Sequence, residues 1–392
     1  MSCRLLVVLA SLGACSARDD GKPASIPRPL DPTSPPLAHA HDAANASSDA
    51  GTAAVPPDAS TRAARIELTF MGDIMFGGYF EAGYTAIESE RHDPLLELDA
   101  QIASDFALAN LETTITRKLD LAGKGHKRFV TTPDRVAPLA KHGITAVTLS
   151  NNHLYDNFAR GLSETPKLAT ELGLLVLGAT RPEPPGVRVE TVDIKGWRVA
   201  IIAVTTRMNT RPRKTEPIPP FVEEAKVATE LPLLVTSARA DHDLVLVAIH
   251  WGNEYQDVPA RWQITAAHAL VDAGADAIIG HHVHVLQGIE RYKSAVIAYS
   301  LGNFIFENGK EIIRQAGILR LGFSNRTGKP CLDLAAFHPT VQRRQPDYHP
   351  VPAIGPELRI AEQRLVSLSK ARPLATTWRI EDARFVTDPA CP

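Results

Sequence analysis

The sequence lacks several features that mark specialised classes of protein. Its 392 residues contain no apolar run of about twenty residues and no long heptad series, which excludes a polytopic membrane protein and a coiled coil. It also lacks an excess of either charge, because 42 Lys and Arg stand against 44 Asp and Glu, so we expect no nucleic-acid partner. The phosphate loop G-x-x-x-x-G-K-[ST] and the nucleophile elbow G-x-S-x-G are absent, which removes the reaction classes that depend on them. With 44% hydrophobic residues, the chain can bury a sizeable core.

Residues 1–15 have the pattern of an export signal. One positive charge at Arg4 precedes an apolar stretch, 5–14, that is too short to span a bilayer but suits a signal peptide. The stretch ends in Leu-Gly-Ala-Cys at 12–15, which resembles the bacterial lipobox, so we expect Cys15 to carry a lipid. An ordinary secretory signal cut nearby and a misassigned start codon are the alternatives. The sequence thus predicts a membrane-anchored lipoprotein of the cell envelope, periplasmic or on the outer surface.

Residues 16–64 are rich in Pro, Ala, Ser and Asp and hold few large apolar side chains. Such a composition cannot bury enough surface to offset its ordering entropy, so we expect an extended linker. Two cysteines, Cys331 and Cys391, remain beyond the signal. An exported compartment permits a disulfide between them, and two separate thiols are the alternative.

From residue 65 onward, apolar runs typical of strands alternate with segments typical of helices. Residues 244–250 form a continuous apolar run, as expected for a strand buried on both faces. This alternation predicts an α/β fold with two sheets packed face to face and helices outside, followed by a polar tail. We expect strands at 65–73, 105–110, 145–150, 174–177, 187–194, 197–204, 244–250, 277–279, 299–306 and 317–323, and helices at 133–142, 158–172, 221–238 and 260–273.

Polar clusters follow five of the expected strands. In open α/β sheets, ligands gather at the carboxyl ends of the strands, so these clusters are candidates for one common site. They are Gly72-Asp73, Asn110-Leu111-Glu112, Ser150-Asn151-Asn152-His153, His250-Trp251-Gly252-Asn253-Glu254-Tyr255 and Gly280-His281-His282-Val283-His284.

The residue types in these clusters favour a site for divalent metal ions. His282 and His284 are two positions apart, so in an extended segment both rings project to the same side. Neutral imidazole is the commonest metal ligand, and the upstream carboxylates supply negative charge. The candidate ligands form a mixed set of N and O donors large enough for two ions: Asp73, Glu112, Asn152, His250, His282 and His284.

Each cluster also has a structural interpretation. Gly72-Asp73 and Asn151-Asn152 are good turn formers, and Trp251 and Tyr255 are suited to pack near a sheet edge. The three His within four residues are harder to explain in this way, because buried imidazoles need partners. The ordered series as a whole favours the metal site.

With Tyr299-Ser300-Leu301-Gly302-Asn303-Phe304, these clusters form an ordered series that resembles the CapA family, the bacterial capsule and poly-γ-glutamate synthesis proteins. That family is similar to the calcineurin-like metallophosphoesterases. The match covers about residues 66–306 and implies a four-layer α-β-β-α sandwich around a two-metal centre. We therefore expect a CapA-like domain at 65–345 and a C-terminal extension at 346–392 that can pack on the domain.

The resemblance also implies roles for individual residues. Asp73 and His284 would hold the first metal, and Glu112 would bridge to the second. His153 would be the catalytic acid. The second metal would be held by Asn152, His250 and His282, and substrate contacts are expected from Asn151, Trp251, Glu254 and Asn303.

Two positions depart from the pattern of the superfamily. Its opening motif is Asp-x-His, whereas Asp73 is followed two residues later by Met75, so the first site lacks one His. Val283 replaces the Pro that the family usually carries between its two His, a change that leaves both rings in place.

The expected function is synthesis or export of a capsule or poly-γ-glutamate, with hydrolysis or transfer at a phosphoester or amide. The expected cofactors are two divalent ions (Mn, Fe, Zn or Mg), and the expected substrate is an anionic polymer or a phosphoester. The alternatives are a non-catalytic subunit of a membrane polymer synthase or export complex, which the missing His favours, and a general periplasmic phosphodiesterase.

Overall fold

The structure is a computed structural model. It describes residues 62–76, 93–118, 129–180, 186–214, 216–306, 311–325, 329–343, 349–381, 384–387 and 391. The predicted signal, the lipidation site Cys15 and nearly all of the predicted linker therefore lie outside the described residues. Among the helices that the structure describes, none is both long enough and apolar enough to cross a membrane.

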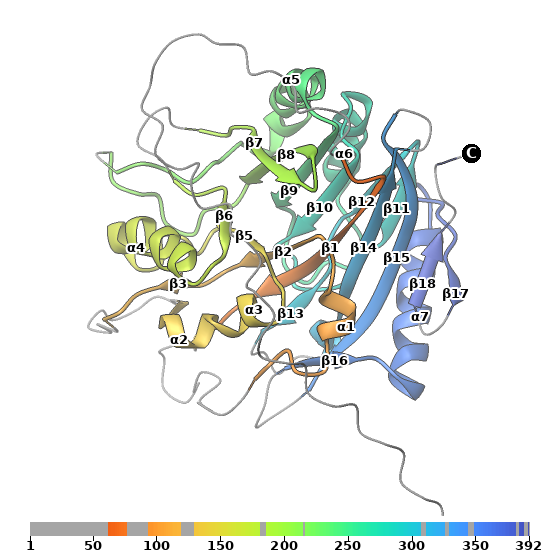
Figure 1. The fold of residues 1–392 in the computed structure, drawn as a ribbon, viewed down its shortest axis with the longest axis horizontal. Helices are drawn as coiled ribbons and strands as arrows, with labels where there is room; N and C mark the ends of the chain where they lie inside the picture. Colours follow the sequence, from red (N-terminus) through yellow and green to blue (C-terminus); the bar gives the residue numbers. More distant parts are fainter. Residues whose placement is uncertain are drawn as a thin grey trace, which may run out of the picture. The chain divides into compact units, whose positions relative to one another are not determined.

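The larger sheet contains ten strands within the described part of the chain (Figure 1). Its order is β17-β18-β15-β14-β1-β2-β5-β6, with β13 paired to β1 and β16 paired to β15. The strands β1, β2, β5 and β6 run parallel, whereas β14 and β15 are antiparallel additions. The bounds are β1 Arg65–Ile74, β2 Phe106–Leu111, β5 Ala146–Thr148, β6 Leu175–Leu177, β13 Asn303–Ile305, β14 Gln315–Ser324, β15 Cys331–Gln342, β16 Pro350–Pro352, β17 Arg379–Glu381 and β18 Arg384–Thr387.

The second sheet has six strands among the described residues, in the order β11-β12-β10-β9-β8-β7. Its four central strands are parallel, and an antiparallel strand closes each edge. The bounds are β7 Glu190–Ile194, β8 Trp197–Thr205, β9 Leu244–His250, β10 Ala277–His281, β11 Ile289–Tyr292 and β12 Ala295–Ala298. A separate short pair joins β3 (Thr114–Ile115) to β4 (Val130–Thr131).

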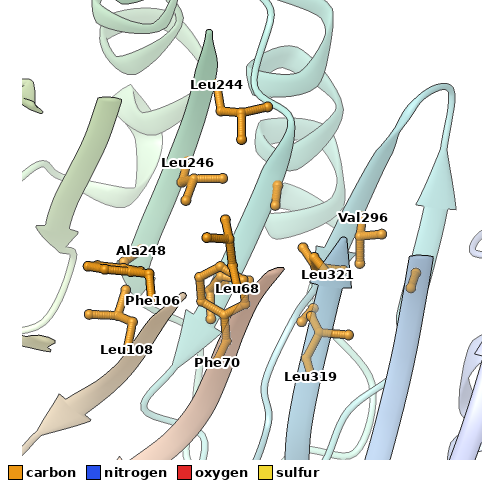
Figure 2. Close-up of a cluster of buried hydrophobic side chains, with 14 of the residues drawn as sticks. Leu68, Phe70, Phe106, Leu108, Leu244, Leu246, Ala248, Val296, Leu319 and Leu321 are labelled. Carbon is orange, nitrogen blue, oxygen red and sulfur yellow. The ribbon is translucent and has the colours of Figure 1, made fainter. Parts of the chain in front are cut away.

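The two sheets pack face to face through a shared hydrophobic core (Figure 2). Strand β9 shows why the sequence folds this way, because its side chains alternate between two cores. Leu244, Leu246 and Ala248 enter the core between the sheets. Val245, Val247 and Ile249 enter the core beneath the outer helices. The continuous apolar run predicted this strand, and burial on both faces is confirmed.

Helices cover the outer face of each sheet, which confirms the predicted four-layer sandwich (Figure 1). The larger sheet is covered by α1 (Asp99–Ile102), α2 (Pro133–Val136), α3 (Pro138–Lys141) and α4 (Phe158–Glu171). The second sheet is covered by α5 (Glu224–Asp241) and α6 (Arg261–Asp272).

Three predicted elements differ from the structure. The helix predicted over 133–142 is divided into α2 and α3 at Pro138, which cannot donate a backbone hydrogen bond. The strand predicted over 299–306 is reduced to β13, which pairs with the end of β1. The helix predicted from residue 221 begins at Glu224 and extends to Asp241, because Phe221 instead makes a β-bridge to Thr205.

The segment after residue 346, where we expected a polar tail, contributes strands to the larger sheet and also carries helix α7 (Gly355–Lys370). A short 3-10 helix, η2 (Glu311–Arg314), precedes β14. Helix α7 is tied to the second sheet, because Ile289 N–H donates to Ser369 Oγ at 3.0 Å. Arg364 donates to the carbonyl of Leu286, just beyond the His cluster, at 2.9 Å. Cys331 and Cys391 form a disulfide in the structure.

The disulfide predicts a measurable effect on stability. Cys331 and Cys391 are 60 residues apart, so the bond restricts the unfolded chain substantially. We expect Cys391→Ser to lower the free energy of unfolding by about 2–4 kcal/mol in urea denaturation. A reductant should lower the stability of the unmodified chain by a similar amount and leave the variant unchanged. Equal stability of both chains without reductant would show that the bond does not form.

A second prediction concerns His338 in β15. Burial and the charges of Arg320 and Arg384 lower the pKa of His338 to about 4, whereas the unfolded imidazole titrates near 6.5. The unfolded chain therefore binds more protons between these values, and stability should fall as the pH drops from 6.5 to 4. We expect urea unfolding across this range to show a loss that is about 1–3 kcal/mol smaller in His338→Gln. Parallel pH profiles would contradict this effect.

Candidate metal centre

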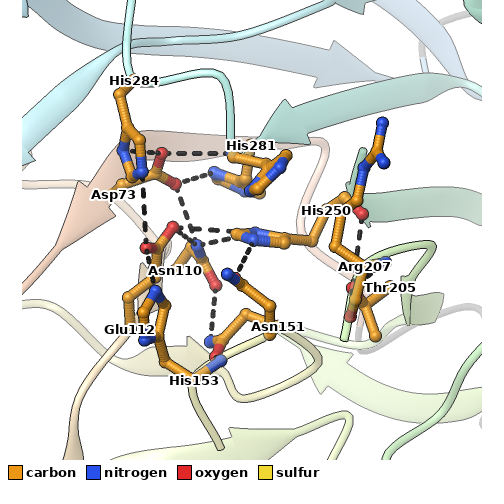
Figure 3. Close-up of polar contacts among 12 residues, drawn as sticks. Asp73, Asn110, Glu112, Asn151, His153, Thr205, Arg207, His250, His281 and His284 are labelled. Atoms are coloured by element: carbon orange, nitrogen blue, oxygen red, sulfur yellow. Dashed lines mark hydrogen bonds and ion pairs between the residues drawn. The ribbon is translucent and has the colours of Figure 1, made fainter. Parts of the chain in front are cut away.

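The candidate site lies where strands from both sheets end (Figure 3). Asp73 lies near the end of β1, and Glu112 directly follows β2. His250 ends β9 and His281 ends β10, in neighbouring positions of the second sheet. The packing of the two sheets therefore brings together side chains that are about 200 residues apart in the sequence.

Asp73, Glu112 and His284 form the compact centre of the site. Each offers a ligand atom, and these atoms all lie within 4.8 Å of one another, in full burial. The His284 ring lies between the carboxylates, with Nδ1 at 3.4 Å from Asp73 Oδ2 and Nε2 at 4.0 Å from Glu112 Oε2. Such a group of carboxylate oxygens and an imidazole suits a divalent cation.

Burial affects the two carboxylates differently. It opposes the charge on Asp73, but His281 and His284 outweigh it and hold the pKa of Asp73 well below its usual range. Burial also raises the pKa of Glu112 well above its usual range, and the charge of Asp73 adds to that rise. One carboxylate is thus compensated by imidazoles, and the other lacks a compensating charge.

Asn110 is a site residue that our list of candidates missed, although its motif was noted. Its side-chain Nδ2 donates to Asp73 Oδ1 at 2.9 Å and to Glu112 Oε1 at 3.0 Å. Asn110 and Glu112 are two positions apart, so they point to the same side of the chain. That spacing is the signal that could have identified Asn110 as the amide that fixes both carboxylates.

The three residues expected to form a second site also come together. His250 Nε2 lies 2.7 Å from Asn152 Oδ1, and the rings of His250 and His282 have centroids 4.6 Å apart. Burial, followed by the charge of a neighbouring imidazole, lowers the pKa of His250 well below its usual range and that of His282 to about 3. Both rings are therefore neutral at pH 7, which is the form that binds metals.

His281 is a second residue that our list of candidates missed. Its Nδ1 lies 3.3 Å from Asp73 Oδ1, and the residue is buried. Neither ring nitrogen makes a hydrogen bond within the described part of the structure. The run of three His at 281–284 was the available signal, but the alternation rule selected His282 and His284 and left His281 out.

The backbone of the His cluster is strained. His282 has φ of 94° and His284 has φ of 61°, in the left-handed region that L side chains rarely adopt. The segment is therefore not the extended chain that the sequence predicted. Gly280 precedes it, and a Cβ there would lie 2.0 Å from the carbonyl oxygen of Tyr299. Backbone strain of this kind is found mainly where a site requires a particular side-chain geometry.

His153 lies at the edge of this group, beside Glu112. Its Nε2 is 4.0 Å from Glu112 Oε2, and its Nδ1 is 2.7 Å from Asp156 Oδ2. Phe129 stacks on the His153 ring with centroids 4.0 Å apart. Asp156 and Phe129 therefore fix the ring so that Nε2 points toward the carboxylates. Neither was anticipated from the sequence.

The four residues expected to contact substrate lie in different environments. Asn151 is buried and donates to the carbonyl of Leu111 at 2.8 Å. Trp251 is fully buried and donates to the carbonyl of Tyr299 at 3.1 Å. Asn303 is buried with its Oδ1 2.8 Å from His284 Nδ1. These three side chains support the site, whereas Glu254 is exposed and its charge acts on Glu112 and His284.

Met75 occupies the position two residues after Asp73, where the opening motif expected from the resemblance has a His. It is buried in a small apolar cluster with Phe129 and Phe306. Phe306 also contacts the ring of His284, with centroids 4.6 Å apart. Apolar side chains therefore lie where a metal ligand would be expected, and the His281 ring lies close to Asp73 instead.

The polar atoms at the centre fit a bound cation. Glu112 Oε2 and His282 Nδ1 are buried and make no hydrogen bond to any described residue. Buried lone pairs without partners are costly, and a divalent ion is a partner that satisfies several of them at once.

The fold and this buried group of carboxylates and imidazoles define an α/β sandwich protein with a candidate metal centre. Residues 67–308 match the model of the bacterial capsule synthesis protein family PGA_cap. The match spans more than half of the chain, so the protein belongs to this family. The predicted resemblance is therefore confirmed.

Two relatives and one solved structure illustrate the similarity. The chain is 30% identical over 267 residues to the capsule biosynthesis protein CapA of Bacillus anthracis, covering 66% of this chain and 64% of that protein. It is 27% identical over 328 residues to the PGA biosynthesis protein CapA of Bacillus subtilis, covering 82% of each. The sulfate thiohydrolase SoxB of Thermus thermophilus aligns at 15% identity with a TM-score of 0.38, covering 77% of this chain and 60% of that chain. A structural similarity of that size carries no argument about activity.

Because no nearby charge compensates Glu112, we expect this carboxylate to lower the free energy of unfolding of the protein when no metal is bound. In a chelator at pH 7, we expect Glu112→Gln to raise the free energy of unfolding by about 1–3 kcal/mol, because a buried carboxylate next to another is costly. Urea denaturation measures this difference.

Glu290→Gln is the matched control for that measurement. Glu290 is equally buried, but its oxygens bind His268 Nε2 at 3.0 Å and Tyr299 OH at 2.8 Å. Its replacement should therefore lower stability. A loss of stability in both variants would argue that Glu112 is compensated.

Proposed function

We propose that this protein acts in the synthesis or export of a capsule or poly-γ-glutamate, through a divalent-metal centre that catalyses hydrolysis or transfer at a phosphoester or amide. The observation that carries the proposal is the buried group of Asp73, Glu112 and His284, with an unpartnered carboxylate oxygen at its centre. The names of the relatives and of the family support the polymer role.

In this proposal the candidate ligands form two neighbouring sets, one for each ion. Asp73 and His284 would hold the first ion, with His281 in place of the His that Met75 replaces. Glu112 would be shared by the two sets. Asn152, His250 and His282 would hold the second ion, which is supported by the contact between His250 and Asn152 and by the proximity of the His250 and His282 rings.

Bound divalent ions would supply Lewis acidity and an activated water at neutral pH. The side chains of the protein position the reaction. His153 directs Nε2 toward the carboxylates and donates a proton to the leaving group, while Asp156 holds the other ring nitrogen. Asn110 keeps the two carboxylates at a fixed separation, so the ligands need little rearrangement.

A second candidate function is a non-catalytic subunit of a membrane polymer synthase or export complex. The observation that favours it is Met75, which replaces a ligand with a thioether packed against Phe129 and Phe306. In both cases we propose that the lipid on Cys15 anchors the protein to the cell envelope.

The first experiment is elemental analysis of the purified full chain, which we expect to retain about two equivalents of a transition metal. Glu112→Ala should lose most of the metal, because it removes the shared ligand. His281→Ala should lose about half. Both should keep the far-UV circular dichroism of the unmodified chain.

His268→Ala is the matched control, since His268 binds Glu290 outside the site and its replacement should not change the metal content. A metal-free unmodified chain would overturn the catalytic proposal and favour the accessory subunit. Full metal content in His281→Ala would remove that residue from the ligand set.

A further inference from the structure

A strongly basic segment follows β8 beside the candidate metal centre. Residues 207–214 contain four cations, Arg207, Arg211, Arg213 and Lys214, and no acidic residue. The whole chain has a net charge of −2, so this concentration of positive charge is local. The metal chemistry proposed above makes no use of it.

Arg207 fixes the start of the segment at the site. Its backbone N–H donates to Thr205 Oγ1, at the end of β8, at 2.9 Å. In Figure 3, His250 lies between Arg207 and the two carboxylates of the site. Its guanidinium donates to Asn253 Oδ1 at 2.8 Å and pairs with Glu224 at 2.5 Å. The charge of Arg207 also acts on His282, one of the proposed ligands.

Two further contacts hold the segment against the loop that carries Asn152 and His153. Asn152 Nδ2 donates to Asn209 Oδ1 at 2.9 Å. Glu216 Oε2 accepts the backbone N–H of Arg213 at 3.0 Å and also the hydroxyl of Tyr155. The segment is thus anchored at its beginning, middle and end to residues around the site.

Three of the cations remain available to a ligand. Arg211, Arg213 and Lys214 are exposed, and none forms a salt bridge with any residue that the structure describes. The nearby acid Glu216 is already occupied by Tyr155 and the backbone of Arg213. The exposed Glu254, which follows the Arg207 partner Asn253, adds a single negative charge. The three exposed cations outnumber it, so an anion is attracted to this segment.

We propose that residues 207–214 form a binding subsite for an anionic polymer chain with repeated carboxylates, which they hold next to the metal centre. This inference rests on the proposed function for the identity of the polymer, whereas the attraction of a chain with several negative charges rests on the exposed cations. Several exposed cations in a short anchored segment match a ligand with several charges better than a single small anion, because exposed ion pairs are weak alone and combine when linked.

The same segment fits a membrane surface less well. Segments that bind membranes combine basic residues with exposed large apolar side chains. Within 207–214 the exposed residues other than the cations are the polar Asn209 and Thr210, and Met208 and Pro212 are half-buried. A single exposed large apolar side chain, Ile218, lies four residues beyond the segment.

The test is fluorescence anisotropy with a labelled decamer of γ-linked glutamate and the full chain. We expect the triple variant Arg211→Ala, Arg213→Ala, Lys214→Ala to bind at least tenfold more weakly at 0.15 M salt. The difference should shrink at 1 M salt, where screening removes charge interactions beyond about 3 Å. Elemental analysis of the same samples shows whether the centre is intact.

The control is a triple variant with the same change in charge at exposed positions on α4 and α7: Lys167→Ala, Arg359→Ala, Lys370→Ala. It should bind like the unmodified chain. An equal loss in both triple variants would show that the effect depends only on overall charge and would overturn the proposal, as would no loss in either.

Loss of binding to phosphatidylglycerol vesicles with unchanged binding of the decamer would assign the segment to a membrane instead. Retained decamer binding by a chain without metal or hydrolysis would contradict the proposed reaction and leave the subsite standing.

Discussion

The burial of two carboxylates side by side is the constraint on which the rest of the site depends. Asp73 and Glu112 are completely inaccessible to solvent, and the charge of each opposes that of the other. The protein manages this repulsion with one amide, Asn110, which donates to both, and with imidazoles around Asp73. Glu112 receives no comparable compensation. A cation bound here would compensate the repulsion between the two buried carboxylates, so its binding would stabilise the folded protein.

The two sheets make this arrangement possible. Parallel strands carry their functional residues at their carboxyl ends, and the face-to-face packing brings the ends of β1 and β2 against those of β9 and β10. The hydrophobic core between the sheets fixes that alignment, so a small shift of one sheet would separate Asp73 from His281. The strained backbone at His282 and His284 is tolerated because rigid strands and Gly280 surround it.

Much of the architecture could be predicted from the sequence, because alternating and continuous apolar runs specify buried strands directly. The run at 244–250 gave the bounds of β9 without error. The bounds of two helices were harder to predict. Pro138 divides the helix expected over 133–142, and Phe221 forms a β-bridge to β8 and is therefore not part of the helix that follows.

The candidate ligands were selected from motifs, since metal-binding chemistry is restricted to few residue types, and folding brings these side chains together. Asn110, His281 and Asp156 were missed for a physical reason. Spacing offered a signal for Asn110 and His281, but their contacts with Asp73 form only on folding. Asp156 contacts His153 through the turn that follows it. A pattern of single residues does not contain those distances. The left-handed backbone at His284 likewise could not be read from a rule that assumes an extended strand.

The C-terminal segment has a consequence for how the family should be delimited. The matched region ends at residue 308, yet β14 and β15 continue the larger sheet and α7 contacts the backbone next to the His cluster. Trp378 Nε1 also donates to the carbonyl of Ile289, at 3.2 Å, at the edge of the second sheet. The residues that match the family model are therefore fewer than those that build the fold, whereas the alignment with the CapA protein of Bacillus subtilis spans 328 residues. A recombinant fragment cut at residue 308 would expose the edge of β1 and remove contacts that support the loop of the candidate metal centre, so inactivity of such a fragment would say nothing about the activity of the full chain.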